Sequence, residues 1–249
     1  MPNTYKTSAV AKIIGIHPNT VRYYEEMGFI PKPKRQSNGY RIFTDIHIEQ
    51  MKLIRLALQI EVLQNGLRET AFEIIKTSAT GDIKKAENLT NRYLDKIKSE
   101  QEKAEEAIII VKQLLSGKKH KAINLSLTRK QAAEYLQITT DTLRNWELNG
   151  LLKVKRKQNG YRVYTDEDIR LLKIIRTLKT ANYSLSAILR LLNGLSYNPQ
   201  GNIKKLIDTP NKTDDIISVC DKLLTSLKSA EENAENILVQ LGKMKKKKK

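Results

Sequence analysis

Two short segments of the chain combine side chains that suit nucleic-acid recognition. The first, HPNTVRYY at residues 17–24, brings amide, hydroxyl and guanidinium groups together with two tyrosines. The second, TTDTLRNW at residues 139–146, follows a similar plan. Amide and guanidinium groups form paired hydrogen bonds with base edges in the major groove, and tyrosines stack on sugars or hydrogen-bond phosphates. Both segments are therefore candidates for a DNA-reading surface.

A basic, turn-rich segment follows each of these stretches. The first is KRQSNGYRIFTD at residues 34–45, and the second is KRKQNGYRVYTD at residues 155–166. Each contains an Asn-Gly pair, which favours a tight hairpin because both residues tolerate positive φ. Lysine and arginine beside such a hairpin suit contacts with phosphates. The pattern predicts a basic two-stranded wing in each half of the chain.

The candidate DNA-contacting residues come from these four segments. They are His17, Asn19, Thr20, Arg22, Tyr23, Tyr24, Lys34, Arg35, Tyr40, Arg41, Thr140, Asp141, Thr142, Arg144, Asn145, Lys155, Arg156, Lys157, Tyr161 and Arg162. Packing of the wing against the core is an equally good interpretation of Tyr40 and Tyr161. Glu25 and Glu147 are expected to hold the recognition arginine or nearby backbone, because phosphates repel a carboxylate.

These segments belong to an internal repeat. Residues 11–55 recur at residues 133–176, with TVRYYEEMGFI aligned to TLRNWELNGLL and one residue lost in the loop that follows. Such self-similarity indicates duplication of one module and therefore predicts two equivalent domains.

Each copy has the pattern of a helix-turn-helix. In the first copy, a helix at residues 8–14 and a turn at residues 15–16 precede a second helix that begins at Pro18 and ends near Gly28. The second copy repeats this plan, with helices at residues 129–136 and after Thr139. A third helix is expected after the Thr-Asp pair that ends each wing, because both residue types cap helices.

A long helix is expected after each module, at residues 83–115 and 214–241. Apolar residues at alternating spacings of three and four predict a coiled-coil seam in both. The proposed pairing residues are Leu89, Tyr93, Ile97, Ala104, Ile108, Val111, Leu115, Ile216, Cys220, Leu223, Leu227, Ala230, Ala234, Ile237 and Leu241. Cys220 is interpreted as a small packing residue, with thiol sensing as the alternative.

The motif TVRYYEEMGFI, the loop with Pro31 and Pro33, and NGYRIFT resemble the N-terminal DNA-binding domain of MerR-family bacterial regulators. The second copy resembles a diverged member, in which an RxWE form like that of recombinase and phage modules replaces the paired tyrosines. The resemblance implies winged helix-turn-helix domains, and long helices that pair antiparallel between two protomers.

The expected fold is mainly α, with two winged helix-turn-helix domains, each followed by a long antiparallel coiled-coil helix. The expected boundaries are 1–80 and 126–200 for the two DNA-binding domains, 81–116 and 201–242 for the coiled-coil helices, 117–125 for a linker and 243–249 for a disordered lysine tail. Because both halves lie in one chain, we expect a monomeric pseudo-dimer that reads two non-identical half-sites. A homodimer with four modules is the alternative.

Composition agrees with a polyanionic partner. Lys and Arg number 45 and Asp and Glu 27, for a net charge of +18. The sequence has no apolar run long enough to span a membrane and no signal-peptide pattern, which favours a cytoplasmic, nucleoid-associated protein. Its one cysteine and three histidines lack the spacing of a metal site, and no catalytic motif is present. No enzymatic activity, metal or cofactor is expected.

Three functional hypotheses follow. The first is a transcriptional regulator that binds double-stranded DNA at a promoter, with RNA polymerase as a further partner. The second is a DNA-architectural or mobile-element accessory factor of the excision or segregation type. The third is a coiled-coil interaction protein whose modules no longer bind DNA.

Overall fold

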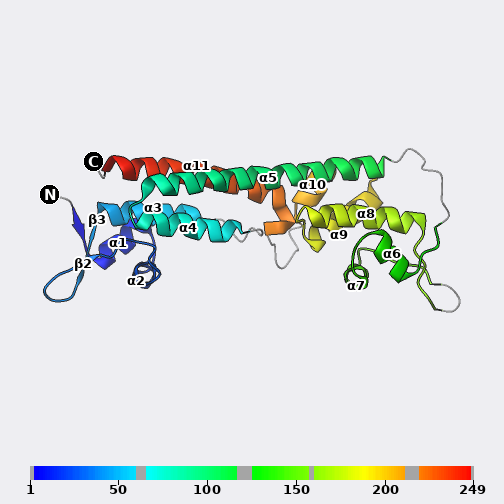
Figure 1. Ribbon diagram of the computed structural model, residues 1–249, viewed down its shortest axis with the longest axis horizontal. Coiled ribbons are helices and arrows are strands. Elements are labelled where there is room, and N and C mark those ends of the chain that lie inside the picture. The colour runs from blue at the N-terminus through cyan, green and yellow to red at the C-terminus, as the bar shows by residue number, and fades with distance from the viewer. Residues whose placement is uncertain (1–2, 60–65, 117–124, 157–159, 211–218, 248–249) are drawn as a thin grey trace. The chain divides into compact units, whose positions relative to one another are not determined.

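The computed structural model describes residues 3–59, 66–116, 125–156, 160–210 and 219–247. The chain is mainly α-helical, as expected (Figure 1). It forms two compact units, one of residues 1–99 with 226–249 and the other of residues 100–225. Each unit combines one copy of the repeat with parts of both long helices.

The first unit begins with a helix-turn-helix. Helix α1 (Thr7–Ile14) ends at Gly15, which adopts a left-handed conformation with φ of 72°. Helix α2 (Pro18–Glu26) starts directly after the turn, with proline in its first position. Val10 and Val21 are fully buried, so the two short helices are held together by apolar packing.

A three-stranded antiparallel sheet follows, in the order β1, β3, β2. Strands β2 (Lys34–Arg35) and β3 (Arg41–Thr44) form the expected wing, whereas β1 (Thr4–Tyr5) was not expected. The wing turn spans residues 36–39, where the Gly39 amide donates to the Gln36 carbonyl and only Gly39 has positive φ, at 83°. The predicted hairpin is therefore present, and of its Asn-Gly pair the glycine alone adopts the left-handed conformation.

Helices α3 (Asp45–Leu58) and α4 (Leu67–Ala79) provide the core beneath this module. Thr44 caps α3 as expected, but the residue that completes the capping box is His47, whose Nδ1 accepts from the Thr44 amide at 3.0 Å. Between the helices, the buried Gln50 amide lies within 3.0 Å of the Phe29 and Ile75 carbonyls. This side chain fixes the loop after α2 against both helices.

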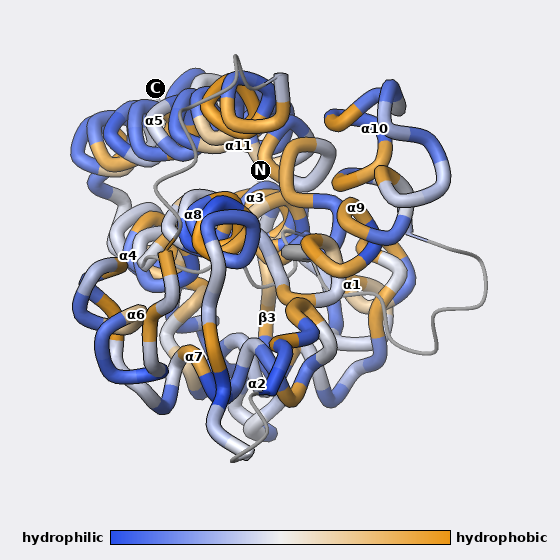
Figure 2. The backbone as a smooth tube through the Cα atoms, turned by 90° about the vertical axis from the view of Figure 1, so that its right-hand side faces the viewer, coloured by the Kyte–Doolittle hydropathy of each residue, from blue (hydrophilic) through white to orange (hydrophobic). Residues whose placement is uncertain are grey.

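Two long helices, α5 (Ile83–Leu115) and α11 (Leu223–Lys247), contribute to both units. In the first unit they run antiparallel, because Lys245 lies 3.0 Å from Glu87 while Lys98 lies 3.9 Å from Glu231. Hydrophobic and hydrophilic residues alternate along both helices (Figure 2). The predicted seam residues are buried at Leu89, Tyr93, Ile97, Ala104, Ile108, Val111, Leu223, Leu227, Ala230, Ala234, Ile237 and Leu241.

Some details of the long helices differ from the prediction. Leu115 is 41% exposed and is not part of a buried seam. Helix α11 continues to Lys247, so the lysine tail that was expected to be disordered is helical over residues 243–247. Ile216 and the side chain of Cys220 lie outside the described part of the chain, and so does most of the linker.

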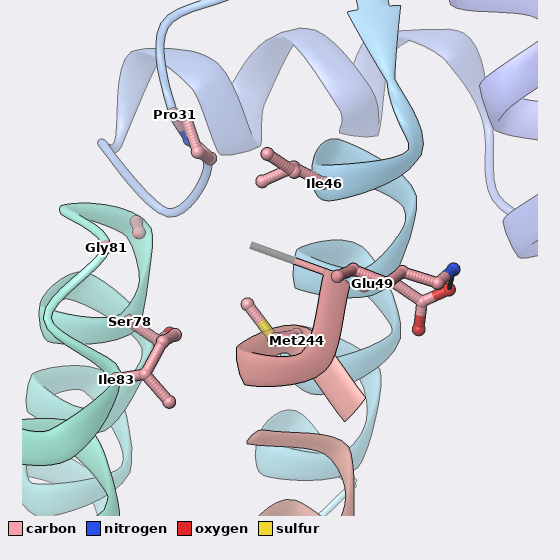
Figure 3. A pocket seen from close by; sticks show the side chains of 9 residues that line it. Pro31, Ile46, Glu49, Ser78, Gly81, Ile83 and Met244 are labelled. Carbon is pink, nitrogen blue, oxygen red and sulfur yellow. Dashed lines mark hydrogen bonds and ion pairs between the residues drawn. The ribbon is translucent and has the colours of Figure 1, made fainter. Parts of the chain in front are cut away.

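The end of α11 docks on α3 within the first unit. The Gln240 amide donates to the Glu49 carboxylate at 2.7 Å and to its backbone carbonyl at 2.9 Å, and Lys247 lies 2.8 Å from the same carboxylate. A small apolar cavity of about 40 Å³ lies at this junction, and Figure 3 shows Glu49 and Met244 among the residues that line it. Polar contacts around an apolar junction therefore attach the C-terminal helix to the first DNA-binding module.

The second unit repeats the helix-turn-helix with α6 (Arg129–Tyr135) and α7 (Thr140–Leu148). Its third helix, α8 (Asp166–Thr180), begins at a capping box formed by Thr165 and Asp168. The described part of its wing contains two isolated antiparallel bridges, Leu127 with Tyr164 and Arg156 with Arg162, in place of the expected paired strands.

The connection from module to long helix is longer in the second unit. Helix α9 (Leu185–Tyr197) is followed by α10 (Ile203–Asp208) and a 3₁₀ turn at Val219–Lys222, where the sequence predicted one coiled-coil region over residues 201–242. Arg190 donates to the carbonyls of Leu206, Ile207 and Asp221 and so joins these pieces to α9. No helix in the described ranges is both long and apolar enough to cross a bilayer.

Candidate nucleic-acid interface

The recognition helix of the first unit is α2, and its exposed face carries most of the predicted base-reading residues. His17, Asn19, Arg22 and Tyr23 are exposed, whereas Thr20 is half-buried. His17 caps the helix, since its Nδ1 accepts from the Asn19 amide at 3.2 Å. The Arg22 guanidinium donates to the Asn19 Oδ1, also at 3.2 Å, which orients the arginine on the outer face.

The recognition helix of the second unit, α7, presents the corresponding face. Thr140, Asp141, Arg144 and Asn145 are exposed, and Thr142 is half-buried. Thr139 caps the helix through a 3.0 Å bond from the Thr142 amide. The predicted base-reading residues are therefore exposed or half-buried at equivalent positions of the two helices, apart from Tyr24.

Tyr24 does not belong to the interface, contrary to the prediction. Its side chain is only 6% exposed and its ring lies 6.1 Å from that of Phe29. Burial raises the pKa of the Tyr24 hydroxyl. Trp146, which aligns with Tyr24 in the second copy, is buried as well. Both aromatic residues pack their recognition helix onto its module and do not face DNA.

The wings carry exposed basic and aromatic side chains. Tyr40 and Tyr161 are 70% and 72% exposed, so neither packs the wing against the core. Lys34, Arg35, Lys155 and Arg156 are exposed too, and Lys157 lies outside the described residues. The wing arginines bond the turn in the same way in both units, because Arg35 donates to Gly39 and Arg156 donates to Gly160, each at 3.3 Å.

A glutamate of the recognition helix binds the wing in the first unit. The carboxylate of Glu25 forms an ion pair with the Nε of Arg41, and Arg35 lies 3.8 Å away. The sequence had suggested that this glutamate holds the recognition arginine, Arg22, or nearby backbone. In the structure it holds a wing arginine, Arg41. Arg41 is half-buried, which leaves it a positioning role together with limited access to a phosphate.

The second unit has a larger version of this contact. Glu147 accepts from Arg162 Nε at 2.7 Å and from Arg129 at 2.8 Å, and it also accepts from the Tyr164 hydroxyl. Burial and the bond to Glu147 raise the pKa of Tyr164 to about 12. The bond that Arg129 donates to the Tyr164 oxygen and the charge of Glu147 raise the pKa of Arg129. Sequence reasoning missed both residues. Arg129 lies outside the basic segments, and Tyr164 lies inside the second one but was not among the candidate residues.

The arrangement suits binding to a duplex. Each unit presents a short helix with exposed donors and acceptors beside a basic wing that carries an exposed tyrosine. A half-buried carboxylate ties the wing to the helix. Such a helix fits the major groove, and cationic wing residues fit the phosphate backbone. Within the described residues, no cluster of three or more His, Cys, Asp or Glu side chains is placed to hold a metal ion.

The fold and this surface define a winged helix-turn-helix protein with two such modules. The family profile described as "MerR HTH family regulatory protein" matches residues 5–65 and 127–195. The chain therefore belongs to the MerR helix-turn-helix family, and both modules are members of it.

Curated relatives resemble one module of the chain. The HTH-type transcriptional regulator CueR of Escherichia coli O6:H1 is 43% identical over 53 residues, which are 21% of this chain and 39% of the relative. The CueR of Yersinia pestis is 40% identical over 62 residues, or 25% of this chain and 45% of the relative. The ZntR homolog of Haemophilus influenzae is 32% identical over 79 residues, which cover 28% of this chain and 58% of the relative.

The chain thus spans between 39% and 58% of the length of these relatives. No solved structure matches it.

Proposed function

We propose that this protein is a sequence-specific, double-stranded DNA-binding transcriptional regulator. The observation that carries the proposal is the repeated surface of an exposed recognition helix beside a basic wing, with a glutamate joining the two in both units. Membership of the MerR family and the regulator names of the matched relatives support the same function. The net charge of +18 favours attraction to a polyanion.

The protein acts, in this proposal, as an intramolecular pseudo-dimer. Its support is the antiparallel packing of α5 against α11 in the first unit, where helices from the two halves of one chain bury a shared apolar seam. The family resemblance implies that such long helices pair between two protomers. In this protein the same pairing would form inside a single chain. Equilibrium sedimentation tests this directly: a mass near 28.5 kDa is expected, and a mass of twice that value at low concentration would contradict it.

A pseudo-dimer with unlike recognition helices reads two unlike half-sites. A homodimer of identical modules reads an inverted repeat, because its symmetry is copied in the DNA. Here TVRYYE and TLRNWE share the exposed arginine but differ at the next exposed position, Tyr23 against Asn145, so the expected site is asymmetric or imperfectly symmetric. Selection of sites from random DNA with the full chain tests this, and recovery of a perfect inverted repeat would contradict the proposal.

The regulated step is transcription initiation at a promoter, with RNA polymerase as the second partner. Footprinting on genomic sequences that match the selected site tests whether the protein binds at promoters. Protection between promoter elements is expected, whereas sites that consistently lie away from promoters would indicate an architectural role.

A further inference from the structure

The two recognition helices can be compared position by position, because the repeat aligns α2 with α7. Arg22 and Arg144 occupy the same position and both are exposed, so they do not distinguish the half-sites. Near the start of the helices, Asn19 aligns with Asp141 and Tyr23 with Asn145, and all four are exposed. His17 and Thr139 also differ, but both cap their helices, and Pro18 aligns with Thr140. The pair of Asn19 and Asp141 replaces a neutral amide by a carboxylate, which is the largest change in hydrogen-bonding character.

In α2, Asn19 presents hydrogen-bond donors. Its Oδ1 accepts from the Arg22 guanidinium at 3.2 Å, which leaves its amide hydrogens to face a ligand. Arg22 is itself a donor only. The pair therefore complements a base edge that accepts hydrogen bonds in the major groove, and guanine, with O6 and N7, offers two acceptors.

In α7, Asp141 presents acceptors alone. An ionised carboxylate has no proton to donate, and it is repelled by phosphates. Among the described residues it forms no ion pair with Arg144, so the contact of Asn19 with Arg22 has no equivalent here. The carboxylate is exposed on the outer face of the helix near its N-terminus, the part of a recognition helix that meets base edges.

The other polar difference does not supply a competing acceptor. The Asn145 Oδ1 accepts from the Asn149 amide at 2.6 Å, and the same amide donates to the Asn145 carbonyl at 2.8 Å. The acceptor of Asn145 is therefore used within α7. Asp141 is the exposed carboxylate on this turn of the helix, beside the Thr140 hydroxyl, which can donate as well as accept.

We propose that Asp141 makes the second module read cytosine at the position where Asn19 makes the first module read guanine. Cytosine presents its N4 amino group as a donor in the major groove, and its own edge carries no acceptor there. Adenine also offers an amino donor, but its N7 acceptor lies beside it and repels the carboxylate. The inference rests on the proposed DNA-binding function and assigns the chemistry of each half-site.

The test is binding-site selection from random DNA with four full-length proteins: wild type, Asp141→Asn, Asn19→Asp and Glu232→Gln. The last is a matched control, because it removes one negative charge from an exposed position on α11, which carries none of the predicted DNA-contacting residues. The measured quantity is the ratio of affinities for duplexes that differ only at one base pair. A ratio is required because removal of any negative charge strengthens binding to all DNA.

Wild type is expected to select one half-site with cytosine at the Asp141 position, favoured about 5- to 100-fold over other bases. Asp141→Asn should abolish that preference and leave the other half-site unchanged. Asn19→Asp should replace guanine by cytosine in the first half-site, and the control should match wild type.

Two outcomes would overturn the inference while leaving the proposed function intact. One is that Asp141→Asn raises affinity uniformly without changing base preference, as Glu232→Gln does. The other is that Asp141→Asn removes a guanine preference, which would mean that Asp141 only orients Arg144. Failure of wild type to select any sequence would instead refute the proposed function itself.

Discussion

The contact between Glu49 and the end of α11 gives a quantitative test of how the C-terminal helix is attached to the first module. Burial alone would raise the pKa of the Glu49 carboxyl, but its bonds with Lys247, Gln240 and Lys52 lower that pKa from 4.5 to about 2. Such a difference corresponds to at most about 3 kcal/mol in favour of the folded state. Because Lys52 and Lys247 are half exposed, solvent screens part of it, and about 1–2 kcal/mol is expected.

The sign of the pH dependence follows from the lowered pKa. Folding and ionisation of Glu49 are coupled, so the stabilisation is complete above the unfolded-state pKa of 4.5 and is lost as the pH falls toward about 2. Glu49→Gln should therefore destabilise the contact between α3 and α11 by about 1–2 kcal/mol at pH 7 and have little effect at pH 2. It should also flatten the acid limb of the stability curve.

Hydrogen exchange measured by mass spectrometry is the suitable assay, because it reports opening free energies separately for peptides from α3 and α11. Glu87→Gln is a matched control: it removes the ion pair with Lys245 between α5 and α11, but at a more exposed site, so a change below about 0.5 kcal/mol is expected. If Glu49→Gln leaves the protection of α11 within error of wild type at pH 7, the contact does not anchor the helix.

Three further predictions address other parts of the chain. Burial lowers the pKa of His47, so the free energy of unfolding should fall as the pH drops below about 6.5. His47→Gln keeps a neutral acceptor for the Thr44 amide and should remove that pH dependence, measured by urea titration. Glu147→Gln should destabilise the second unit by about 1–3 kcal/mol, seen in the fluorescence of the single tryptophan; an unchanged midpoint would rule out the contact as a stabilising one. Combined Arg22→Ala and Arg144→Ala should weaken specific DNA binding at least about 10-fold and reduce its salt dependence, and full retention of both would refute the assigned reading face.

The helices and their caps could be predicted because local chemistry specifies them. Proline at the start of α2 and threonine before α3 and α8 act within one helical turn, so their effect is visible in the sequence. The turn between α6 and α7 was predicted only by analogy with the first copy. Gln137 there has φ of 51°, a left-handed conformation for which glutamine has no preference, where the first copy has Gly15.

The membership of the interface was harder to predict, because it depends on which side of a short helix faces the core. Tyr23 and Tyr24 are neighbours of the same type, yet one is 52% and the other 6% exposed. Val21 precedes Tyr24 by three positions and is buried with it, so the helical period carried the necessary signal. Helix α10 gave no such signal, since its role depends on bonds from Arg190, which lies in the preceding helix.

The comparison of the two copies separates residues that build the interface from residues that give it specificity. Glu25 and Glu147 hold a wing arginine in both units and are half-buried, so their identity is required by the contact between wing and helix. Asn19 and Asp141 are exposed at equivalent positions and differ in hydrogen-bonding character. A change at Glu25 or Glu147 should alter the position of the wing in its unit. A change at Asn19 or Asp141 should alter only what the helix can bind. The combined substitutions Asn19→Asp and Asp141→Asn should therefore alter DNA specificity without loss of stability in either unit.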